Sequence, residues 1–169
     1  PPPIHAPATP EIYTQVNSSA ASDVYKRQRY GCRIVLTGGP SELEKDYGRK
    51  ITDLCGPETV NLVGKTSLKD LLAVLDAADA LISPDSGPAH MATAVGTPVI
   101  GLYATSNPAR SGPYLSRDLT VNAYPEAVGR YLGKTVKQLR WGQRVRDPGA
   151  MDLIRLRDVN AKIDQVFGN

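Results

Sequence analysis

The sequence predicts an α/β fold, in which helices cover both faces of a parallel β-sheet. Short apolar runs rich in β-branched residues alternate with segments of helical periodicity from residue 29 onward. Glycine, proline or a serine at a helix start separates each run from the next. This strand–helix alternation is typical of parallel sheets, because parallel strands need a crossover helix between them.

The strands are predicted from four short apolar runs: RIVLT, VNLV, ALIS and PVIGLY. Turn residues bound each run, and runs of this kind fit strands that are buried on both faces. The expected strands cover residues 33–37, 60–63, 80–83 and 98–103.

The helices are predicted from their ends and from apolar residues at helical spacing. Ser41 and Ser67 are each followed three residues later by an acidic residue, which is the spacing of a capping box. A helix of small residues is expected from about Gly87 to Val95, with Gly96 at its end. The side chains expected to face inward are Leu43, Tyr47, Ile51 and Leu54, then Leu68, Leu71, Leu72 and Leu75, and finally Leu156, Val159, Ile163, Val166 and Phe167 in a last helix.

The two ends of the chain depart from this pattern. Residues 1–28 are proline-rich at first and show neither helical nor strand periodicity. Within them, SAASDVYKRQ resembles a scar at the ends of truncated environmental reading frames, so we expect a non-domain or non-native segment. Residues 29–169 are then expected to form one domain, in which residues 124–154 look irregular and basic.

Length and composition favour a single packed domain over a membrane-spanning or secreted protein. The chain has 169 residues, enough for about one domain, and 41% of them are apolar, which suffices for a packed core. We find no apolar run of membrane-spanning length and no secretion signal, so a cytoplasmic protein is expected. Cys32 and Cys55 lack metal-ligand and redox spacing and are expected to be buried thiols. The net charge of +3 permits an anionic ligand but gives little reason to expect nucleic acid.

The candidate site lies where the predicted strands end. Parallel sheets bind ligands beyond the carboxyl ends of their strands, so the loops GGPSE, SPDSGPAH and YATSNPARSGPY are expected to converge on one rim. Asp85, Ser86 and Gly87 stand at a helix start, where free N–H groups and the helix dipole favour a phosphate. His90 can face the same ligand and either donate to a phosphoryl oxygen or orient Asp85. From spacing alone, an ordinary capped helix with a surface histidine fits equally well.

Two further groups of residues on this rim fit either a ligand-binding role or a purely structural one. Glu42, just after GGP, is either a helix-start partner or an acceptor for sugar or ribose hydroxyls. Thr105, Ser106 and Arg110 either hold an anion, with arginine as a two-pronged phosphate clamp, or form a loop with good turn chemistry. The chain has no P-loop, no GxGxxG fingerprint and no GxSxG elbow, and one rim histidine makes no metal cluster.

Taken together, these motifs resemble glycosyltransferase family 9, the bacterial lipopolysaccharide heptosyltransferases. The resemblance covers about residues 33–114 and is carried by LTGGPSELE, by NLVGKTSLKDLLAVLDAADALISPDSGPAH and by GTPVIGLYATSNPARSGPY. It implies a GT-B architecture of two Rossmann-like domains, with this chain as the carboxy-terminal half that binds the nucleotide sugar. It further implies inverting transfer of heptose from ADP-heptose to Kdo-lipid A or a core heptose, with no metal cofactor.

The resemblance also implies roles for individual residues. Asp85, Ser86, Gly87 and His90 are implied to contact the heptose and diphosphate of the donor, and Glu42 its ribose or nearby groups. The catalytic base is expected in an amino-terminal acceptor domain that this chain lacks, so no catalytic residue is assigned and no turnover by the chain alone is expected. The full expected donor site is Gly39, Glu42, Asp85, Ser86, Gly87, His90, Thr105, Ser106 and Arg110.

Two other functions fit the same residues. One is a GT-B transferase that uses another nucleotide sugar, and the other is a Rossmann-like nucleotide-binding module. The basic tail is either a solvated face or a contact with the anionic acceptor or lipid headgroups at the inner membrane. Its cations are Arg130, Lys134, Lys137, Arg140, Arg144 and Arg146.

Overall fold

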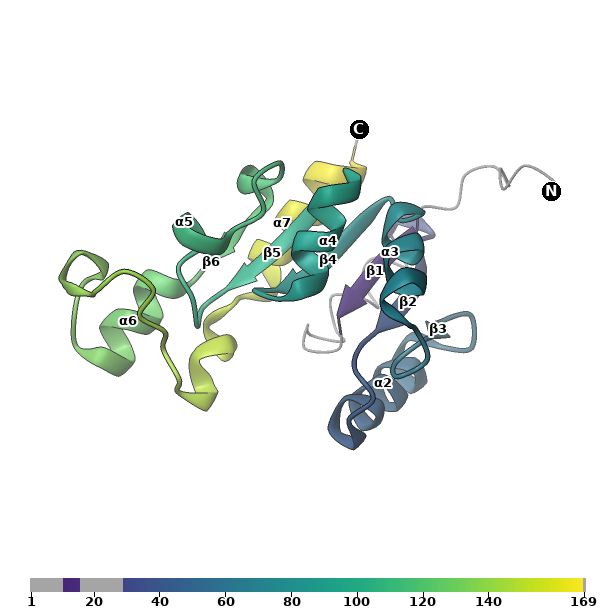
Figure 1. Cartoon of the computed structure of the whole chain (residues 1–169), viewed down its shortest axis with the longest axis horizontal. Coiled ribbons are helices and arrows are strands. Elements are labelled where there is room, and N and C mark those ends of the chain that lie inside the picture. Colours follow the sequence, from purple (N-terminus) through teal and green to yellow (C-terminus); the bar gives the residue numbers. More distant parts are fainter. Residues whose placement is uncertain (1–10, 16–28, 169) are drawn as a thin grey trace.

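A single parallel sheet organises the protein (Figure 1). The computed structural model describes residues 11–15 and 29–168. Within them, six strands lie in the order β3-β2-β1-β4-β5-β6, which is the strand order of a Rossmann fold. Each neighbouring pair of strands runs parallel. The predicted α/β fold class is confirmed.

The described elements alternate along most of the chain. The strands are β1 (Glu11–Gln15), β2 (Arg33–Thr37), β3 (Val60–Asn61), β4 (Ala80–Pro84), β5 (Val99–Tyr103) and β6 (Val121–Asn122). The α-helices are α2 (Glu42–Cys55), α3 (Leu68–Asp76), α4 (Gly87–Val95), α5 (Pro108–Ser111), α6 (Tyr124–Leu132) and α7 (Leu156–Phe167). Short 3-10 helices are η1 (Arg117–Leu119), η2 (Val136–Gln138) and η3 (Pro148–Leu153).

Strand β1 lies in the segment for which the sequence pattern predicted no strand. It pairs with β2 on one side, in the register Ile12↔Ile34, and with β4 on the other, in the register Ile12↔Ala80. The prediction missed it because a five-residue strand between two partners depends on pairing that its own sequence does not reveal. The rest of residues 1–28 lies outside the described residues, and the domain boundary at residue 29 stays a prediction.

Helices cover both faces of the sheet. Side chains alternate along each strand, so Leu81 faces α3 and α4 whereas Ile82 faces α7. Helix α2 lies on the same face as α7, against Ile34 and Leu36. The first face is built by Ile34, Leu36, Ile51, Cys55, Ile82, Ile100, Val159 and Ile163, and the second by Val35, Leu75, Leu81, Ala89, Ala92 and Val99.

The buried face of α2 differs from the predicted one. Ile51 is buried as predicted, but Leu43 and Leu54 are 65% and 64% exposed, and Gly48 and Cys55 are buried in their place. Gly48 allows a close approach, since a Cβ there would lie 3.0 Å from side-chain atoms of both Asn61 and Val63. The prediction placed the large apolar side chains inward, whereas the close packing of α2 buries the small residues Gly48 and Cys55. The other predicted inward residues that are exposed are Tyr47, Leu68, Leu72 and Leu156.

Helix α6 lies in the segment that was predicted to be irregular. Pro125 stands in its first turn, and Gly133 ends it at a φ of 61°. Tyr124, Ala127 and Val128 form its buried face. The helix is only nine residues long, so its apolar repeat is too short to stand out in the sequence.

Other predictions about local structure hold. Ser67 and Asp70 form a complete capping box, and Gly96 ends α4 in the left-handed region. Ser41 receives the N–H of Glu44 but the return bond of a capping box is not seen. Cys32 and Cys55 are buried thiols that form no disulfide, as expected. None of the described helices has the length and apolar character needed to cross a bilayer.

Candidate functional site

Strand β4 places Asp85 and Ser86 at the carboxyl edge of the sheet. It lies beside β1, where the strand order reverses, and open α/β sheets bind ligands at this switch point. Ser86 occupies the N-cap position of α4, but its side chain makes no capping hydrogen bond. The hydroxyls of Ser83 and Ser86 instead lie 2.7 Å apart. The α4 start therefore differs from the ordinary capped helix that the sequence left open.

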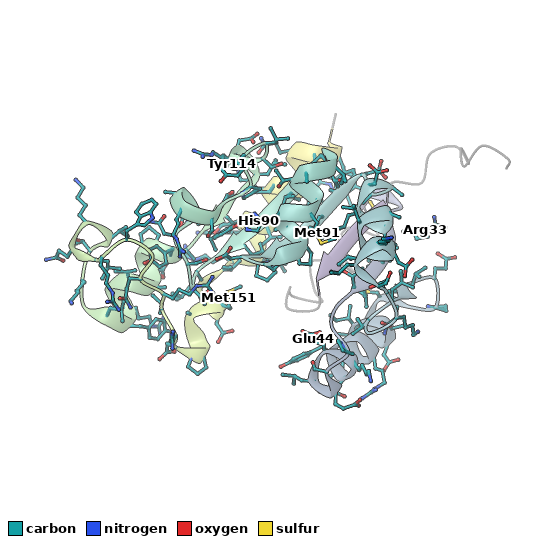
Figure 2. The ribbon with its side chains drawn as sticks, viewed as in Figure 1. Arg33, Glu44, His90, Met91, Tyr114 and Met151 are labelled. Atoms are coloured by element: carbon teal, nitrogen blue, oxygen red, sulfur yellow. The ribbon has the colours of Figure 1, made fainter. Side chains whose placement is uncertain are left out.

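Gly87 opens α4 with free space in front of it. A Cβ built on Gly87 would meet no atom within 4 Å, so the packing of the chain itself does not require glycine here. The first turn of α4 contains no acidic residue, which leaves the positive end of the helix dipole uncompensated within the helix. His90 is exposed one turn further on, on the side of α4 toward α5 (Figure 2). Gly87 and His90 are both exposed, so this turn is open to solvent.

Asp85 is paired with a residue from far along the chain. Nη2 of Arg144 lies 2.9 Å from Oδ2 of Asp85, and the two residues are 59 positions apart. The Asp85 side chain is 9% exposed and that of Arg144 is 50% exposed. A carboxylate with so little contact to water needs a compensating charge, and Arg144 supplies it. From the sequence alone, Arg144 was identified only as one of the cations of the basic tail, and its pairing with Asp85 was not predicted.

Arg144 belongs to a segment, residues 140–146, that we call the strap. The N–H of Val145 donates to the carbonyl oxygen of Thr105 over 2.9 Å, and the Tyr124 hydroxyl donates to that of Gln143 over 2.6 Å. The Val145 side chain is 1% exposed and packs in the cluster around α6. These contacts hold the strap against the loop that follows β5.

The loop after β5 carries the other predicted anion ligands. Arg110 lies on α5 beside the strap, because a Cβ on Gly142 would lie 3.1 Å from its Nη1 atom. Ser106 is buried, and its hydroxyl has no hydrogen-bond partner within the described structure. Thr105 meets the strap through its carbonyl oxygen. The structure thus links Asp85, Thr105 and Arg110 to one segment.

Tyr103, the last residue of β5, is hydrogen-bonded to the end of α5 in this loop. Its hydroxyl donates to the carbonyl oxygen of Ser111 over 2.9 Å. Burial, and then the negative charge of Asp85, raise the pKa of Tyr103 to about 12. Tyr103 is therefore neutral at physiological pH, and it fixes the end of α5 to β5.

The GGP loop occupies a separate part of the rim. Strand β1 lies between β2, which leads to this loop, and β4. Glu42 is 82% exposed in its side chain and pairs with Nζ of Lys45 at 2.9 Å, which lowers the pKa of Glu42. Glu44, rather than Glu42, lies over Gly39: a Cβ on Gly39 would lie 2.7 Å from Oε2 of Glu44. Among the described contacts, none joins Glu42 to Asp85, His90 or Arg110.

Comparison with known families identifies the chain. The model of the family described as glycosyltransferase family 9 (heptosyltransferase) matches residues 24–137, well over half of the sequence. The chain belongs to glycosyltransferase family 9. This membership confirms the resemblance of the DSGPAH and GTPV motifs.

Known glycosyltransferases are similar to this chain in sequence or in fold. The lipopolysaccharide core heptosyltransferase OpsX of Haemophilus influenzae is 39% identical over 131 residues, which are 78% of this chain and 38% of OpsX. A family 9 glycosyltransferase from Veillonella parvula matches 94% of this chain with a TM-score of 0.69 and 20% identity, over 46% of its own length. TibC from enterotoxigenic E. coli, an iron-containing dodecameric heptosyltransferase solved with ADP-D-beta-D-heptose, matches 96% of this chain with a TM-score of 0.58 and 15% identity, over 46% of its own length. The chain therefore spans less than half the length of each of these proteins.

The described part of the chain contains no cluster of metal-ligating side chains. No group of three or more His, Cys, Asp and Glu side chains lies there in a position to hold a metal ion.

Proposed function

We propose that this chain is the donor-binding part of an inverting glycosyltransferase that transfers heptose from ADP-heptose to the lipopolysaccharide inner core. The acceptor in this proposal is Kdo-lipid A or a core heptose. The observation that carries the proposal is the open Asp85–Ser86–Gly87 turn at the switch point of the sheet. Membership in family 9 and the similarity to OpsX support the substrate class.

The diphosphate of the donor is assigned to the start of α4. The helix dipole contributes about 0.3–1 kcal/mol to an anion there, so specific donors must supply most of the affinity. We assign Ser86, His90 and Arg110 as these donors, with Gly87 giving access to the backbone and Thr105 and Ser106 lining the neighbouring loop. During transfer the leaving diphosphate gains charge, and donors already in place stabilise it.

The two carboxylates of the rim are assigned to hydroxyl groups. Asp85 repels a diphosphate, so it accepts hydrogen bonds from the heptose instead. Glu42 and Gly39 are assigned to the ribose end of the nucleotide. Two strand spacings of about 4.8 Å separate the ends of β2 and β4, and a nucleotide sugar is long enough to cross the resulting gap of roughly 10 Å.

The acceptor site and the catalytic base belong, in this proposal, to a part of the protein outside this chain. The chain binds donor but does not turn it over alone. The proposed transfer needs no metal, so EDTA leaves donor binding and the activity of the complete enzyme unchanged. Loss of either on treatment with EDTA, and recovery with a divalent cation, contradicts that statement.

We place the complete enzyme in the cytoplasm, in peripheral contact with the inner membrane. The tail supports this contact with Arg130, Lys134, Lys137, Arg140 and Arg146, for which the described residues contain no ion pair. Each cation near an anionic surface contributes about 1 kcal/mol. Binding to vesicles with anionic lipid that disappears at high salt supports the contact, and absence of binding at low salt contradicts it.

Calorimetric titration tests the donor assignment. The chain is titrated with ADP-heptose, ADP and UDP, and the His90→Ala variant is titrated in parallel. We expect ADP-heptose to bind more tightly than ADP, UDP to bind weakly, and the variant to lose affinity. Equal binding of ADP and ADP-heptose indicates a nucleotide-binding module, and a preference for UDP indicates another donor. If none binds, even with the acceptor domain of a relative added, the proposal is wrong.

A further inference from the structure

We infer that the strap is a wall of the donor site and that Arg144 is a positioning residue that holds Asp85 toward the sugar of the donor. This inference rests on the proposed function. It assigns a role in donor recognition to residues 140–146, which lie beyond the motifs that first indicated the site.

The pair geometry determines what Asp85 can offer a ligand. Arg144 contacts Oδ2 of Asp85 at 2.9 Å, and Oδ1 takes no part in this ion pair. The guanidinium binds this one oxygen and restricts rotation of the carboxylate, in a place that is largely closed to water. A carboxylate with one oxygen held in place is a directed acceptor for a sugar hydroxyl.

The strap is anchored well enough to position a charge. Its three fixed points are the Val145 N–H on Thr105, the Tyr124 hydroxyl on Gln143, and the buried side chain of Val145. Arg144 lies between Gln143 and Val145, so anchors on both sides limit its movement. Such support is what a site needs to hold a group in one orientation.

Arg144 and Arg110, the two arginines near Asp85 and α5, differ in whether they form an ion pair. Arg144 is neutralised by Asp85, whereas Arg110 beside Gly142 has no ion pair among the described residues. The charge of Arg110 therefore remains for the diphosphate, and Arg144 acts on the sugar through Asp85. Loss of Arg110 is therefore expected to weaken the binding of ADP and of ADP-heptose, whereas loss of Arg144 is expected to weaken the binding of ADP-heptose alone.

The test compares ADP-heptose with ADP, because only ADP-heptose carries the sugar. We expect Arg144→Ala to weaken ADP-heptose binding about 10- to 100-fold, the effect of losing the partner of a buried charged group, and to leave ADP binding within about two-fold. Arg144→Lys, which keeps the charge but not the fork, restores part of the loss. Arg157→Ala is the matched control: Arg157 pairs with its neighbour Asp158 on α7, and none of the described contacts joins it to Asp85, Arg110 or the strap. We expect this variant to bind both ligands normally.

A double-mutant cycle then separates positioning from direct contact. If Arg144 acts through Asp85, Arg144→Ala adds little to the loss caused by Asp85→Asn. Equal weakening of ADP and ADP-heptose by Arg144→Ala, no effect on either, or fully additive losses overturns the inference. Arg144→Gln replaces Arg144→Ala if melting curves show that the alanine variant does not fold. If the unmodified chain binds neither ligand, even with the acceptor domain of a relative added, the proposed function fails and this inference fails with it. Normal donor binding with an unaffected Arg144 variant refutes the inference alone.

Discussion

The hydroxyl of Tyr103 donates a hydrogen bond of 2.9 Å to the carbonyl oxygen of Ser111. Tyr103 ends strand β5 and is 1% exposed, and Ser111 ends α5, the short helix that carries Arg110. We expect Tyr103→Phe to lower the free energy of unfolding by about 1 kcal/mol, because the carbonyl oxygen loses its partner. Urea unfolding followed by circular dichroism measures the change. An unchanged midpoint would show that the bond contributes nothing.

The same tyrosine predicts a difference in stability at alkaline pH. The pKa of Tyr103 is raised to about 12 in the folded chain, against about 10 in an unfolded one. The folded chain therefore keeps a proton that the unfolded chain releases, so this contribution is complete below pH 10 and is lost as the pH rises toward 12. We expect the stability advantage over Tyr103→Phe to be larger at pH 9 than at pH 11.5. A constant or widening difference contradicts the assigned pKa.

Gly101 lies against the Tyr103 ring in the middle of β5. A Cβ at this position would lie 2.7 Å from Cε2 of Tyr103, which is held by its hydrogen bond. We expect Gly101→Ala to cost about 1–3 kcal/mol in unfolding free energy. Gly129→Ala in α6 is the control: nothing lies within 4 Å of its Cβ, and alanine favours the helix by up to about 1 kcal/mol. Equal stability of the two variants would refute the tight packing at Gly101.

Gly87→Ala separates binding from folding. Since no described atom beyond the neighbouring residues and the helix's own backbone lies within 4 Å of the added methyl group, we expect a change of at most about 0.5 kcal/mol in stability. The methyl group would stand where the donor diphosphate approaches α4, and a clash of about 1–3 kcal/mol weakens ADP-heptose roughly 5- to 150-fold. Melting curves and calorimetry on the same sample measure both quantities. Normal affinity in a stable variant would place the diphosphate elsewhere.

Arg110→Ala should weaken ADP and ADP-heptose to a similar extent. Its guanidinium has no ion pair in the described part of the chain, and both ligands carry the diphosphate that it is proposed to bind. We expect a loss of about 10-fold or more for each ligand. Calorimetry gives both constants, with Arg157→Ala as the reference variant. A loss confined to ADP-heptose would instead place Arg110 at the sugar.

The sequence predicted the elements whose signals are local. Four apolar runs identified β2 to β5, and Ser67 with Asp70 identified the start of α3. The same kind of signal placed Asp85 and Gly87 at a strand end and a helix start. These features depend on neighbouring residues, so one sequence is enough to reveal them.

Features that depend on distant parts of the chain were not predictable in this way. The pairing of Asp85 with Arg144 joins two loops through the folded sheet, and neither loop carries a pattern that indicates the other. The prediction that Leu43 and Leu54 lie on the inner face of α2 was wrong, because Gly48 and Cys55 pack more closely against the sheet than these leucines could. The predicted convergence of three loops did not anticipate β1, which separates the GGP loop from Asp85.

The central place of β1 bears on how this protein can be handled. Strands β2 and β3 meet β4, β5 and β6 within the sheet only through residues 11–15. Expression from residue 29, the boundary that the sequence suggested, would leave β2 and β4 as two open edges with unpaired backbone groups. Open edges of this kind recruit strands from other molecules, so the trimmed protein would tend to aggregate, while one that starts before residue 11 would remain in solution.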